Sequence, residues 1–424
     1  MARLVISGPT PLRGSLPASG AKNAALPIIA ASILAQGRVV LERVPNISDV
    51  WCMADILRGM GAQVDYNGDG RMVLDTSKVN TVAPHELVRK MNASFDVAGP
   101  LLACYGEAEV SLPGGCRLGP RPVDLHIMGF RKLGAEVTSE RGFVKARAKR
   151  LVGDRIVFPK VSVGATKNCL MAATLAEGET LLENCAREPE IVDLANFLIK
   201  MGANIQGHGS SSITIKGVKR LHGVEYHILA DRIEVGTYLI GAVVTGGDLT
   251  IEDCVPEHVA SLLDRLREAG QEVTVWDKSV RVKHVHPIKP LEVATAPYPG
   301  FPTDLHPQMV TMMTLADGAS ILQETIFSGR FMYAMELVRL GAKLKVSDRQ
   351  VLVRGTDRLF GVPVDAPDIR AGGALVLAAL AAEGETVISG VRYIDRGYQE
   401  IESRLSSVGA HIRRLEQPLT PVPN

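Results

Sequence analysis

The sequence shows no excess of charge of either sign and no hydrophobic run long enough to cross a membrane. Its 47 Lys and Arg residues nearly balance its 46 Asp and Glu residues, so no global field attracts nucleic acid or an anionic membrane. The longest apolar stretch, at 23–34, is too short to span a bilayer and lacks the basic start and cleavage site of a signal peptide. We expect neither nucleic acid nor a membrane as a partner, and any anion must be bound by locally placed cations. The sequence leaves the oligomeric state open.

Metal and nucleotide-cofactor motifs are also missing. The cysteines form no CxxC pair, and no Cys/His set has zinc spacing. GxGxxG and the Walker lysine motif are absent, so no motif indicates a dinucleotide or an NTP. Dispersed thiols without a disulfide framework favour a reducing compartment. We therefore expect a cytoplasmic protein without metal or cofactor; its cysteines are Cys52, Cys104, Cys116, Cys169, Cys185 and Cys254.

What the sequence does contain is a short signature that recurs along the chain. It reads GAQV at 61, GAEV at 134, GANI at 202, GQEV at 270, GAKL at 341 and GAHI at 409, at intervals of roughly 70 residues. An Ala-rich apolar segment, a short strand such as ETLLEN at 179–184 and an amphipathic helix such as IVDLANFLIKM at 191–201 come before it. We expect the glycine to end that helix as a C-cap, after which a second strand begins.

The repeat predicts an α/β fold with two domains. A helix that is apolar nearly all round belongs in a core, and 46% apolar with 22% charged residues is the composition of a globular protein. Six units suggest two domains of three units each, with buried helices inside and sheets and amphipathic helices outside. A cleft between the domains is the natural ligand site.

One cysteine lies outside the pattern of the repeat. The position after each first strand is apolar, and Cys185 and Cys254 at that position are expected to be core residues. The equivalent residues of other units are Val44, Ile326 and Val391. In LPGGCRLGPRPVDLH, at 112–126, a glycine takes this position and Cys116 follows it in a longer, glycine-rich loop. Cys116 is therefore either an incidental loop thiol or a reactive residue, whose thiolate Arg121 would favour. A reactive Cys116 could be a nucleophile or a proton donor.

Charged residues gather where the apolar helices are expected to begin. Lys22 and Asn23 precede one such helix, Asp304 another, and Asp368 and Arg370 a third. Helix N-termini favour anions, and a cation there adds to such a site. Asp304 could be an N-cap or a general base. Loops after first strands carry Arg121, Arg330 and Arg396, and arginine suits bidentate binding of carboxylate or phosphate.

Several segments together resemble one enzyme family along essentially the whole chain. They are SGAKNAALP, LPGGCRLGPRPVDLH, VSVGATKN, NCAREPEIVDLANFL, DRIEVGTYL, FPTDLHPQ, PDIRAG and IDRGY. On these motifs the chain resembles the UDP-N-acetylglucosamine 1-carboxyvinyltransferases, which are enolpyruvyl transferases. The resemblance implies two inside-out α/β barrels, each of three repeats around buried helices. It implies one domain at 22–229 and a second formed by 1–21 with 230–424, with the active site in the cleft between them.

The resemblance also implies a reaction, with phosphoenolpyruvate and UDP-N-acetylglucosamine as substrates. In this family the enolpyruvyl group is transferred to the 3′-hydroxyl of the sugar by addition and elimination, which is the first committed step of peptidoglycan precursor synthesis. Cys116 matches the proton donor that can form an adduct with phosphoenolpyruvate and is alkylated by fosfomycin. Asp304 matches the candidate base. Residues matching the phosphoenolpyruvate site are Lys22, Asn23, Arg121, Arg330, Arg370 and Arg396, of which Lys22 and Arg396 are also counted as catalytic.

The nucleotide-sugar site implied by the resemblance has one departure. Its matching positions are Asn92, Arg121, Pro122, Val123, Asp124, Leu125, Lys160, Val161, Ser162, Val163, Asp304 and Ile326. Asn92 stands where the family usually has an arginine that contacts the nucleotide sugar. Asp96 places a charge where an apolar residue is usual, and Ser328-Gly329 replace a common Glu-Asn before Arg330.

Two alternative functions remain open. One is an enolpyruvyl transferase with another acceptor, such as shikimate 3-phosphate or a different nucleotide. The cysteine loop at 112–126 argues against shikimate 3-phosphate, whereas Asn92 leaves a different nucleotide open. The other is a paralogue that binds the nucleotide sugar without catalysis. Arguing against it is the presence of Lys22, Cys116, Asp304, Arg370 and Arg396.

Overall fold

The computed structural model describes residues 2–89, 91–112 and 123–416, and within these ranges the chain folds into two compact units. One unit is formed by residues 20–229. The other combines the N-terminal segment, up to residue 19, with the chain from residue 230 onward.

The described strands of residues 20–229 form three small sheets. The strands are β3 (Arg38–Glu42), β4 (Gln63–Tyr66), β5 (Met72–Asp75), β6 (Glu107–Ser111), β7 (Glu136–Glu140), β8 (Phe143–Arg147), β9 (Arg155–Val157), β10 (Glu179–Glu183), β11 (Asn204–Gln206), β12 (Ser212–Lys216) and β13 (Glu225–His227). The sheet orders are β13-β3-β5-β4, β6-β8-β7 and β11-β12-β10-β9. Each sheet has one buried face, as in β10, where Thr180 and Leu182 point inward.

The described part of the other unit also has three sheets. Its strands are β1 (Arg3–Gly8), β2 (Arg13–Pro17), β14 (Asp248–Glu252), β15 (Glu272–Trp276), β16 (Ser279–Lys283), β17 (Glu292–Ala294), β18 (Ala319–Gln323), β19 (Lys343–Ser347), β20 (Gln350–Arg354), β21 (Val364–Asp365), β22 (Gly384–Ser389) and β23 (His411–Leu415). The sheet orders are β15-β16-β14-β2, β17-β18-β20-β19 and β21-β22-β1-β23.

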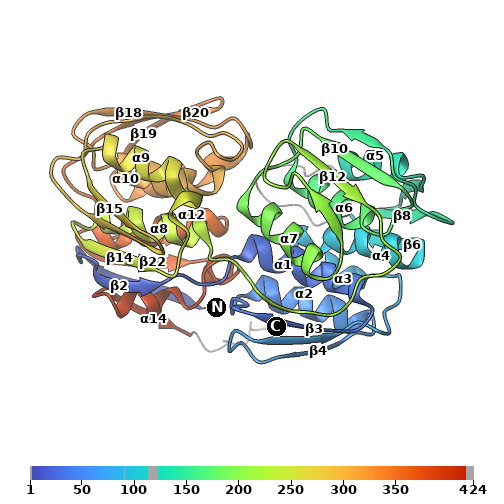
Figure 1. Cartoon of the computed structure of the whole chain (residues 1–424). Coiled ribbons are helices and arrows are strands. Elements are labelled where there is room, and N and C mark those ends of the chain that lie inside the picture. Colours follow the sequence, from blue (N-terminus) through green and yellow to red (C-terminus); the bar gives the residue numbers. More distant parts are fainter. Residues whose placement is uncertain (1, 90, 113–122, 417–424) are drawn as a thin grey trace. The chain divides into compact units, whose positions relative to one another are not determined.

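The N-terminal strands complete sheets built by later segments. β1 pairs antiparallel with both β22 and β23, with Leu4 opposite Ile388 and Arg414. β2 runs parallel to β14, with Leu16 opposite Ile251, and Figure 1 shows its dark blue ribbon beside β14. The first segment of the chain is therefore part of the unit that residues 230–416 form.

Helices fill the interior of each unit and also cover its outside (Figure 1). In residues 20–229 they are α1 (Lys22–Ala31), η1 (Ser32–Ala35), α2 (Ser48–Gly59), α3 (His85–Val88), η2 (Asn92–Val97), α4 (Ala98–Tyr105), α5 (Asp124–Lys132), α6 (Val163–Ala173) and α7 (Pro189–Lys200). The other unit has α8 (Arg232–Val244), η3 (Pro256–Val259), α9 (Ala260–Glu268), η4 (Thr303–Leu305), α10 (His306–Met313), η5 (Arg330–Tyr333), α11 (Ala334–Arg339), α12 (Ile369–Ala381), α13 (Val391–Ile394) and α14 (Ile401–Ser406).

The Ala-rich helices are the buried ones, as the sequence predicts. Every residue of α8 is buried, and α12 is buried from Arg370 to Leu380. α8, α10 and α12 pack against one another, and small residues permit this approach. A Cβ added to Gly241 of α8 would lie 3.0 Å from the Leu377 side chain of α12, and one added to Gly236 of α8 would lie 2.5 Å from the Leu305 side chain just before α10. By contrast, the outer helix α9 buries only one face, through Leu262, Leu263 and Leu266.

The repeated glycines end the amphipathic helices, as predicted. All six have the positive φ that glycine tolerates without steric cost, from 85° at Gly270 to 107° at Gly202. Three sheets and three central helices in each described unit match three repeats per domain, so the predicted inside-out α/β architecture is confirmed.

The core positions after the first strands agree with the repeat at all but one residue. Cys185 and Cys254 are buried, as predicted, at 1% and 3% exposure. Ile326 differs from the equivalent residues of the other units, because its exposed fraction is 36%. The chain turns there so that the backbone N–H of Ile326 donates to the Glu324 carboxylate, which leaves the side chain of Ile326 outside the core.

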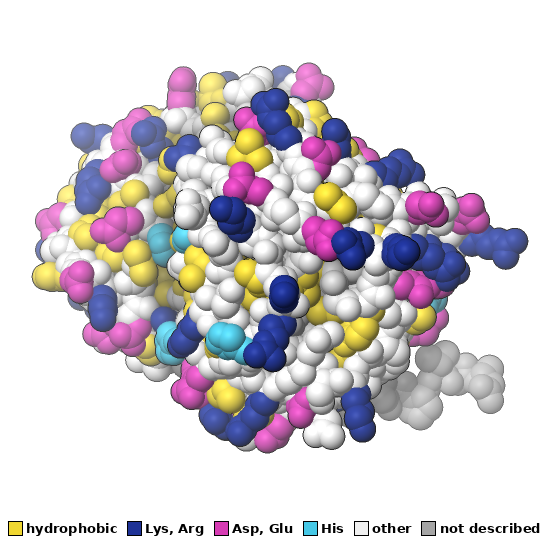
Figure 2. Space-filling view, turned by 45° about the vertical axis from the view of Figure 1, so that its right-hand side comes forward, with side chains coloured by type: hydrophobic (Ala, Val, Ile, Leu, Met, Phe, Trp, Pro, Cys, Tyr) yellow, Lys and Arg dark blue, Asp and Glu magenta, His cyan; other side chains and the backbone are white. Residues whose placement is uncertain are grey.

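The surface in Figure 2 carries acidic and basic side chains interspersed over the face in view. This distribution agrees with the near balance of charges in the sequence. No helix among the described residues is long and apolar enough to cross a membrane.

Candidate active site

The first turns of α8, α10 and α12 meet at one end of their helix cluster. Gln308 in α10 donates from Nε2 to the Thr237 hydroxyl in α8, at 3.1 Å. Asp368 caps α12 by accepting the backbone N–H groups of Arg370 and Ala371. Because helix N-termini carry partial positive charge, this end of the cluster favours negative charge.

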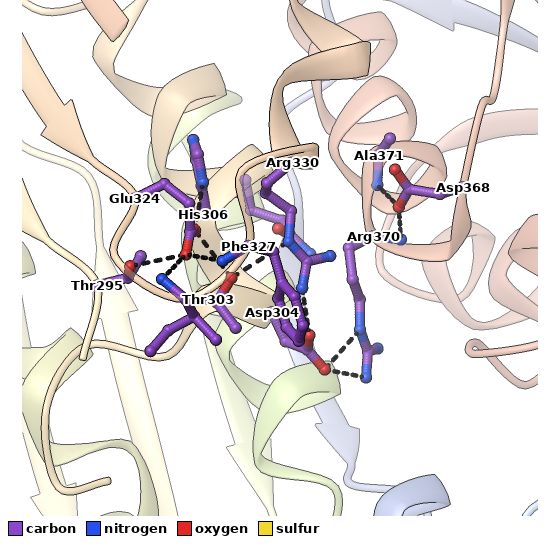
Figure 3. A network of polar contacts seen from close by, with 12 residues as sticks. Thr295, Thr303, Asp304, His306, Glu324, Phe327, Arg330, Asp368, Arg370 and Ala371 are labelled. Atoms are coloured by element: carbon purple, nitrogen blue, oxygen red, sulfur yellow. Dashed lines mark hydrogen bonds and ion pairs between the residues drawn. The ribbon is translucent and has the colours of Figure 1, made fainter. Parts of the chain in front are cut away.

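Two arginines hold the carboxylate of Asp304 in this region (Figure 3). Arg330 donates from Nη2 to Oδ1 at 2.8 Å. Arg370 donates from Nη2 and Nε to Oδ2, at 2.9 and 3.1 Å. The interpretation of Asp304 as an N-cap is wrong, because neither η4 nor α10 has a side-chain cap. Burial would raise the pKa of Asp304, but Arg370 and Arg330 outweigh burial and hold this pKa far below its usual value.

The two arginines are more deeply buried than the carboxylate between them. Their side chains are 2% and 5% exposed for Arg330 and Arg370, against 26% for Asp304. Arg232 at the start of α8 is also buried and further lowers the pKa of Asp304. The Nη1 atom of Arg370 is buried and has no hydrogen-bond partner among the described residues. Asp304 is therefore held between two buried guanidinium groups, of the kind that suits a carboxylate or phosphate ligand.

A second buried carboxylate, Glu324, organises the segment before Arg330 (Figure 3). Its Oε1 accepts the backbone N–H groups of Ile326 at 2.7 Å and Phe327 at 3.0 Å. Its Oε2 accepts the Thr303 hydroxyl at 2.8 Å and the Nδ1–H of His306 at 2.9 Å. The Thr303 hydroxyl in turn accepts Nε–H of Arg330 at 3.2 Å. Glu324 is thus connected to Asp304 through Thr303 and Arg330.

The pKa of Glu324 follows from these contacts. Burial would raise it, but the hydrogen bonds from His306 and from the backbone of Phe327 and Ile326 lower it to about 2. Glu324 is therefore an ionised carboxylate at neutral pH, and the groups that donate hydrogen bonds to it stabilise its negative charge.

Replacing Glu324 by Gln is expected to lower the free energy of unfolding by about 3 kcal/mol at neutral pH, because the buried donors lose their ionised partner. The contribution is present above the unfolded pKa of about 4.5 and is lost as the pH falls towards the folded pKa of about 2. Wild type and E324Q should therefore converge in stability in acid. Urea unfolding at several pH values measures the difference in stability. The control is Glu383→Gln, which removes an exposed ion pair with Arg358. Equal stability of E324Q and wild type at neutral pH would contradict the assignment.

In residues 20–229, Lys22 begins α1 and is buried despite its charge. Its Nζ lies 2.7 Å from the Asp49 carboxylate in α2. Asn23 follows it on α1 and is half-buried. The predicted cation at this helix start is therefore present, held by a buried carboxylate.

The starts of α5 and α6 lie close together in the same unit. His126 on α5 approaches Gly164 on α6, where an added Cβ would lie 2.9 Å from the His126 Nε2. Asn168 accepts the backbone N–H of Gly99, which directs its amide nitrogen to Nδ1 of His126 at 3.0 Å. Burial lowers the pKa of His126 to about 3, so the ring is neutral, accepts at Nδ1 and carries its proton on Nε2.

Seven positions of the predicted nucleotide site belong to these two helix starts. Val123 and Leu125 are buried, whereas Asp124, Lys160, Val161 and Val163 are exposed. Ser162 caps α6 by accepting the backbone N–H of Ala165 at 3.3 Å. The structure thus brings segments 123–126 and 160–164 together, and their role in binding stays a prediction.

The unexpected charge of Asp96 is neutralised inside the protein. Asp96 lies in η2, the element that Asn92 begins, and its Oδ2 is 2.5 Å from Nζ of Lys167 on α6. Burial raises the pKa of Asp96, and Lys167 opposes that rise. The two charges thus replace apolar packing between η2 and α6.

Lys167→Met is expected to lower the free energy of unfolding by about 3 kcal/mol, since it leaves Asp96 buried without its partner. The double variant Asp96→Leu with Lys167→Met should recover most of the loss, because a well-packed apolar pair can replace a buried ion pair. Thermal unfolding of both variants checks this. A double variant no more stable than K167M would show that the charges are needed for another reason.

The remaining predicted site residues either lie in a segment between two helices or fall outside the described ranges. Arg396 is half-buried in the segment between α13 and α14. Cys116, Arg121 and Pro122 lie outside the described residues. Glu324, Asp49 and Arg232 are site residues that the sequence motifs did not predict. For Glu324 the available signal was a polar residue at the next inward-facing position after strand β18, whose residues alternate between exposed and buried. Among the described residues, no group of three His, Cys, Asp or Glu side chains could hold a metal ion.

Comparisons with known proteins identify the family of this chain. Residues 6–405 match the family model described as EPSP synthase (3-phosphoshikimate 1-carboxyvinyltransferase). The chain belongs to this family. A relative from Koribacter versatilis (strain Ellin345), named UDP-N-acetylglucosamine 1-carboxyvinyltransferase, is 50% identical over 420 residues, with 98% of this chain and 97% of the relative covered. A relative of the same name from Nitratidesulfovibrio vulgaris (strain DSM 19637 / Miyazaki F) is 48% identical, with 98% and 100% covered.

Solved structures of an enolpyruvyl transferase and of an EPSP synthase share the fold. The enolpyruvyl transferase NikO from Streptomyces tendae superposes with a TM-score of 0.87 at 26% identity, covering 98% of this chain and 99% of that one. An EPSP synthase from Acinetobacter baumannii has a TM-score of 0.76 at 17% identity, with 98% and 100% covered. The family resemblance predicted from the motifs is confirmed.

Proposed function

We propose that this chain transfers the enolpyruvyl group of phosphoenolpyruvate to the 3′-hydroxyl of UDP-N-acetylglucosamine and releases phosphate. The observation that carries the proposal is the cluster of Arg330, Asp304 and Arg370, in which two buried arginines hold a carboxylate. Such a cluster suits a reaction in which one substrate supplies a carboxylate for the arginines and the other a hydroxyl for Asp304. The relatives named UDP-N-acetylglucosamine 1-carboxyvinyltransferase, about half identical over nearly the full chain, support this acceptor.

The chemistry needs an acid, a base and cations. Addition of a proton to C3 of phosphoenolpyruvate makes C2 electron-poor, and the sugar oxygen attacks C2 as its own proton leaves. Loss of phosphate from the resulting ketal, with loss of one proton from C3, gives the enol ether. Acid and base each contribute through a positioned proton transfer, and fixed cations stabilise the anionic groups in the transition states.

The proposed roles draw on both units of the chain. Cys116 supplies the proton for C3, and Asp304 accepts the proton of the sugar hydroxyl. Arg330 and Arg370 bind the carboxylate of phosphoenolpyruvate. Its phosphate is bound by Lys22, Arg121 and Arg396, and Asn23 contacts the tetrahedral intermediate. The buried positions of Lys22, Arg330 and Arg370 support these roles, because a cation in a site with little water attracts an anion strongly.

The nucleotide sugar is proposed to bind at the starts of α5 and α6. Residues 123–125 and 160–163 lie at these helix starts, together with Arg121 and Pro122 in the preceding segment of the chain, and Asn92 and Ile326 are proposed to take part. The exposed side chains of Lys160, Val161 and Val163 are accessible to a ligand. We place the reaction in the cytoplasm, at the start of peptidoglycan precursor synthesis, which fits the dispersed thiols of the sequence.

Phosphate release from phosphoenolpyruvate tests this proposal when it is measured with several acceptors. UDP-N-acetylglucosamine, UDP-glucose and shikimate 3-phosphate are each added to the wild-type protein over a range of concentrations. We expect saturable release with UDP-N-acetylglucosamine only, and its half-saturation reports how well the site works with Asn92. Release that depends on shikimate 3-phosphate or UDP-glucose instead would identify another acceptor. Binding of UDP-N-acetylglucosamine without release would indicate a paralogue without catalysis.

A further inference from the structure

The arrangement of Asp304 raises a chemical difficulty for the proposed reaction. Asp304 is to accept a proton, yet Arg330 and Arg370 hold its carboxylate through three hydrogen bonds. These contacts keep its pKa far below the usual value, and a carboxylate held in this way is a poor base. The same arginines are the proposed partners of the substrate carboxylate.

The arginines are fixed more firmly than Asp304. Arg330 is anchored through Nε on Thr303, which is bound to Glu324. Arg370 lies in the buried first turn of α12 and over the ring of Tyr398, 5.9 Å from its centroid. The Asp304 side chain lies in a short 3-10 turn and is the most exposed member of the cluster, at 26%. When an anionic ligand enters, Asp304 can therefore move more readily than either guanidinium.

The hydrogen bonds made by the guanidinium group of Arg370 show which group a substrate carboxylate must displace. Asp304 Oδ2 occupies both Nε and Nη2 of Arg370, which is the edge that binds a carboxylate in a bidentate manner. Nη1 of the same guanidinium is buried and has no hydrogen-bond partner among the described residues. An incoming carboxylate thus gains the bidentate edge of Arg370 only if Asp304 leaves it.

We propose that Asp304 occupies, in the ligand-free protein, the place on Arg330 and Arg370 that the carboxylate of phosphoenolpyruvate takes, so that binding of this substrate releases Asp304 to act as the base. This inference rests on the proposed function. The exchange makes the base available only when the enolpyruvyl donor is bound. It moves no covalent bond, since one carboxylate replaces another on the same two guanidinium groups.

The exchange makes Asp304 a competitor of the substrate, and binding to Asp304→Asn tests this. Titration calorimetry compares Cys116→Ser with Cys116→Ser/Asp304→Asn, because the serine background excludes an adduct with phosphoenolpyruvate. The double variant is expected to bind phosphoenolpyruvate at least about tenfold more tightly, since a charge-assisted competitor has been removed. Inorganic phosphate, which has no carboxylate, should gain much less. Equal gains for both anions would indicate general electrostatics and overturn the exchange, as would unchanged or weaker binding of phosphoenolpyruvate.

Two controls keep the result specific. Glu234→Gln changes another buried carboxylate of the same unit, which contacts Ser19, Tyr238 and Arg404, and should leave the affinity for phosphoenolpyruvate unchanged. Asp304→Ser is the second variant if the asparagine variant does not fold, and the same tightening is expected. Wild-type turnover separates the two hypotheses. If the wild type releases phosphate with UDP-N-acetylglucosamine but the Asp304 variants bind no more tightly, only the exchange fails. If the wild type releases no phosphate from phosphoenolpyruvate with UDP-N-acetylglucosamine, the proposed function fails.

Discussion

Arg370→Gln is expected to lower kcat/KM for phosphoenolpyruvate by about a thousandfold. Arg370 is nearly fully buried, and its edge makes two of the three hydrogen bonds to Asp304. Glutamine removes the charge that stabilises the substrate carboxylate, and removal of one preorganised donor in an active site costs about 10²–10³ in rate. Loss of a bidentate partner for a buried anion adds to this.

Steady-state phosphate release measures the effect of R370Q, and two further variants serve as comparisons. Arg370→Lys should recover little, because an ammonium group cannot form the bidentate contact. Arg358→Gln removes an exposed arginine of the same unit, paired with Glu383, and should retain wild-type kinetics. R370Q activity within about tenfold of the wild type would show that Arg370 does not bind the reacting substrate.

Cys116→Ser is expected to lower kcat by about 10²–10⁴, the range that a positioned proton donor contributes, and to leave thermal stability unchanged. Serine keeps the size of the side chain, but a hydroxyl is a far weaker acid than a thiol. Fosfomycin should inactivate the wild type by alkylating Cys116 and have no effect on the variant. An active, fosfomycin-sensitive serine variant would contradict the role assigned to Cys116.

The matched control is Cys104→Ser in α4. Cys104 is half-buried, its Sγ lies 3.7 Å from the backbone oxygen of Ile33, and burial raises the pKa of its thiol to about 12. It therefore stays protonated and unreactive at neutral pH. C104S should retain turnover and fosfomycin sensitivity, with alkylation mapped to Cys116 by peptide mass spectrometry.

The fold could be predicted in detail because its information is local and repeated. Each GAxV signature fixes a helix end through one glycine, and Gly61, Gly202 and Gly409 adopt the positive φ that this role needs. The apolar helices could be assigned to the interior because they have no polar face. Ile326 departs from the repeat because the Glu324 carboxylate captures its backbone N–H, and a repeat pattern carries no information about that contact.

The site could be predicted residue by residue but not as a network. Asp304, Arg330 and Arg370 each drew attention by their place before helices or after strands. That they bind one another depends on packing between helices, and Asp304 and Arg370 are 66 positions apart in the chain. The same applies to Lys22 with Asp49 and to Asp96 with Lys167, whose partners only the fold brings near.

The most direct test of the proposed reaction is the structure of its product. Wild-type protein is incubated with phosphoenolpyruvate and UDP-N-acetylglucosamine, and the nucleotide-sugar fraction is examined by NMR while phosphate is quantified. We expect an enol ether on the 3′-oxygen of the sugar, formed in equal amount with phosphate. Phosphate released without modification of the sugar, or an enolpyruvyl group on another oxygen, would contradict the proposed reaction.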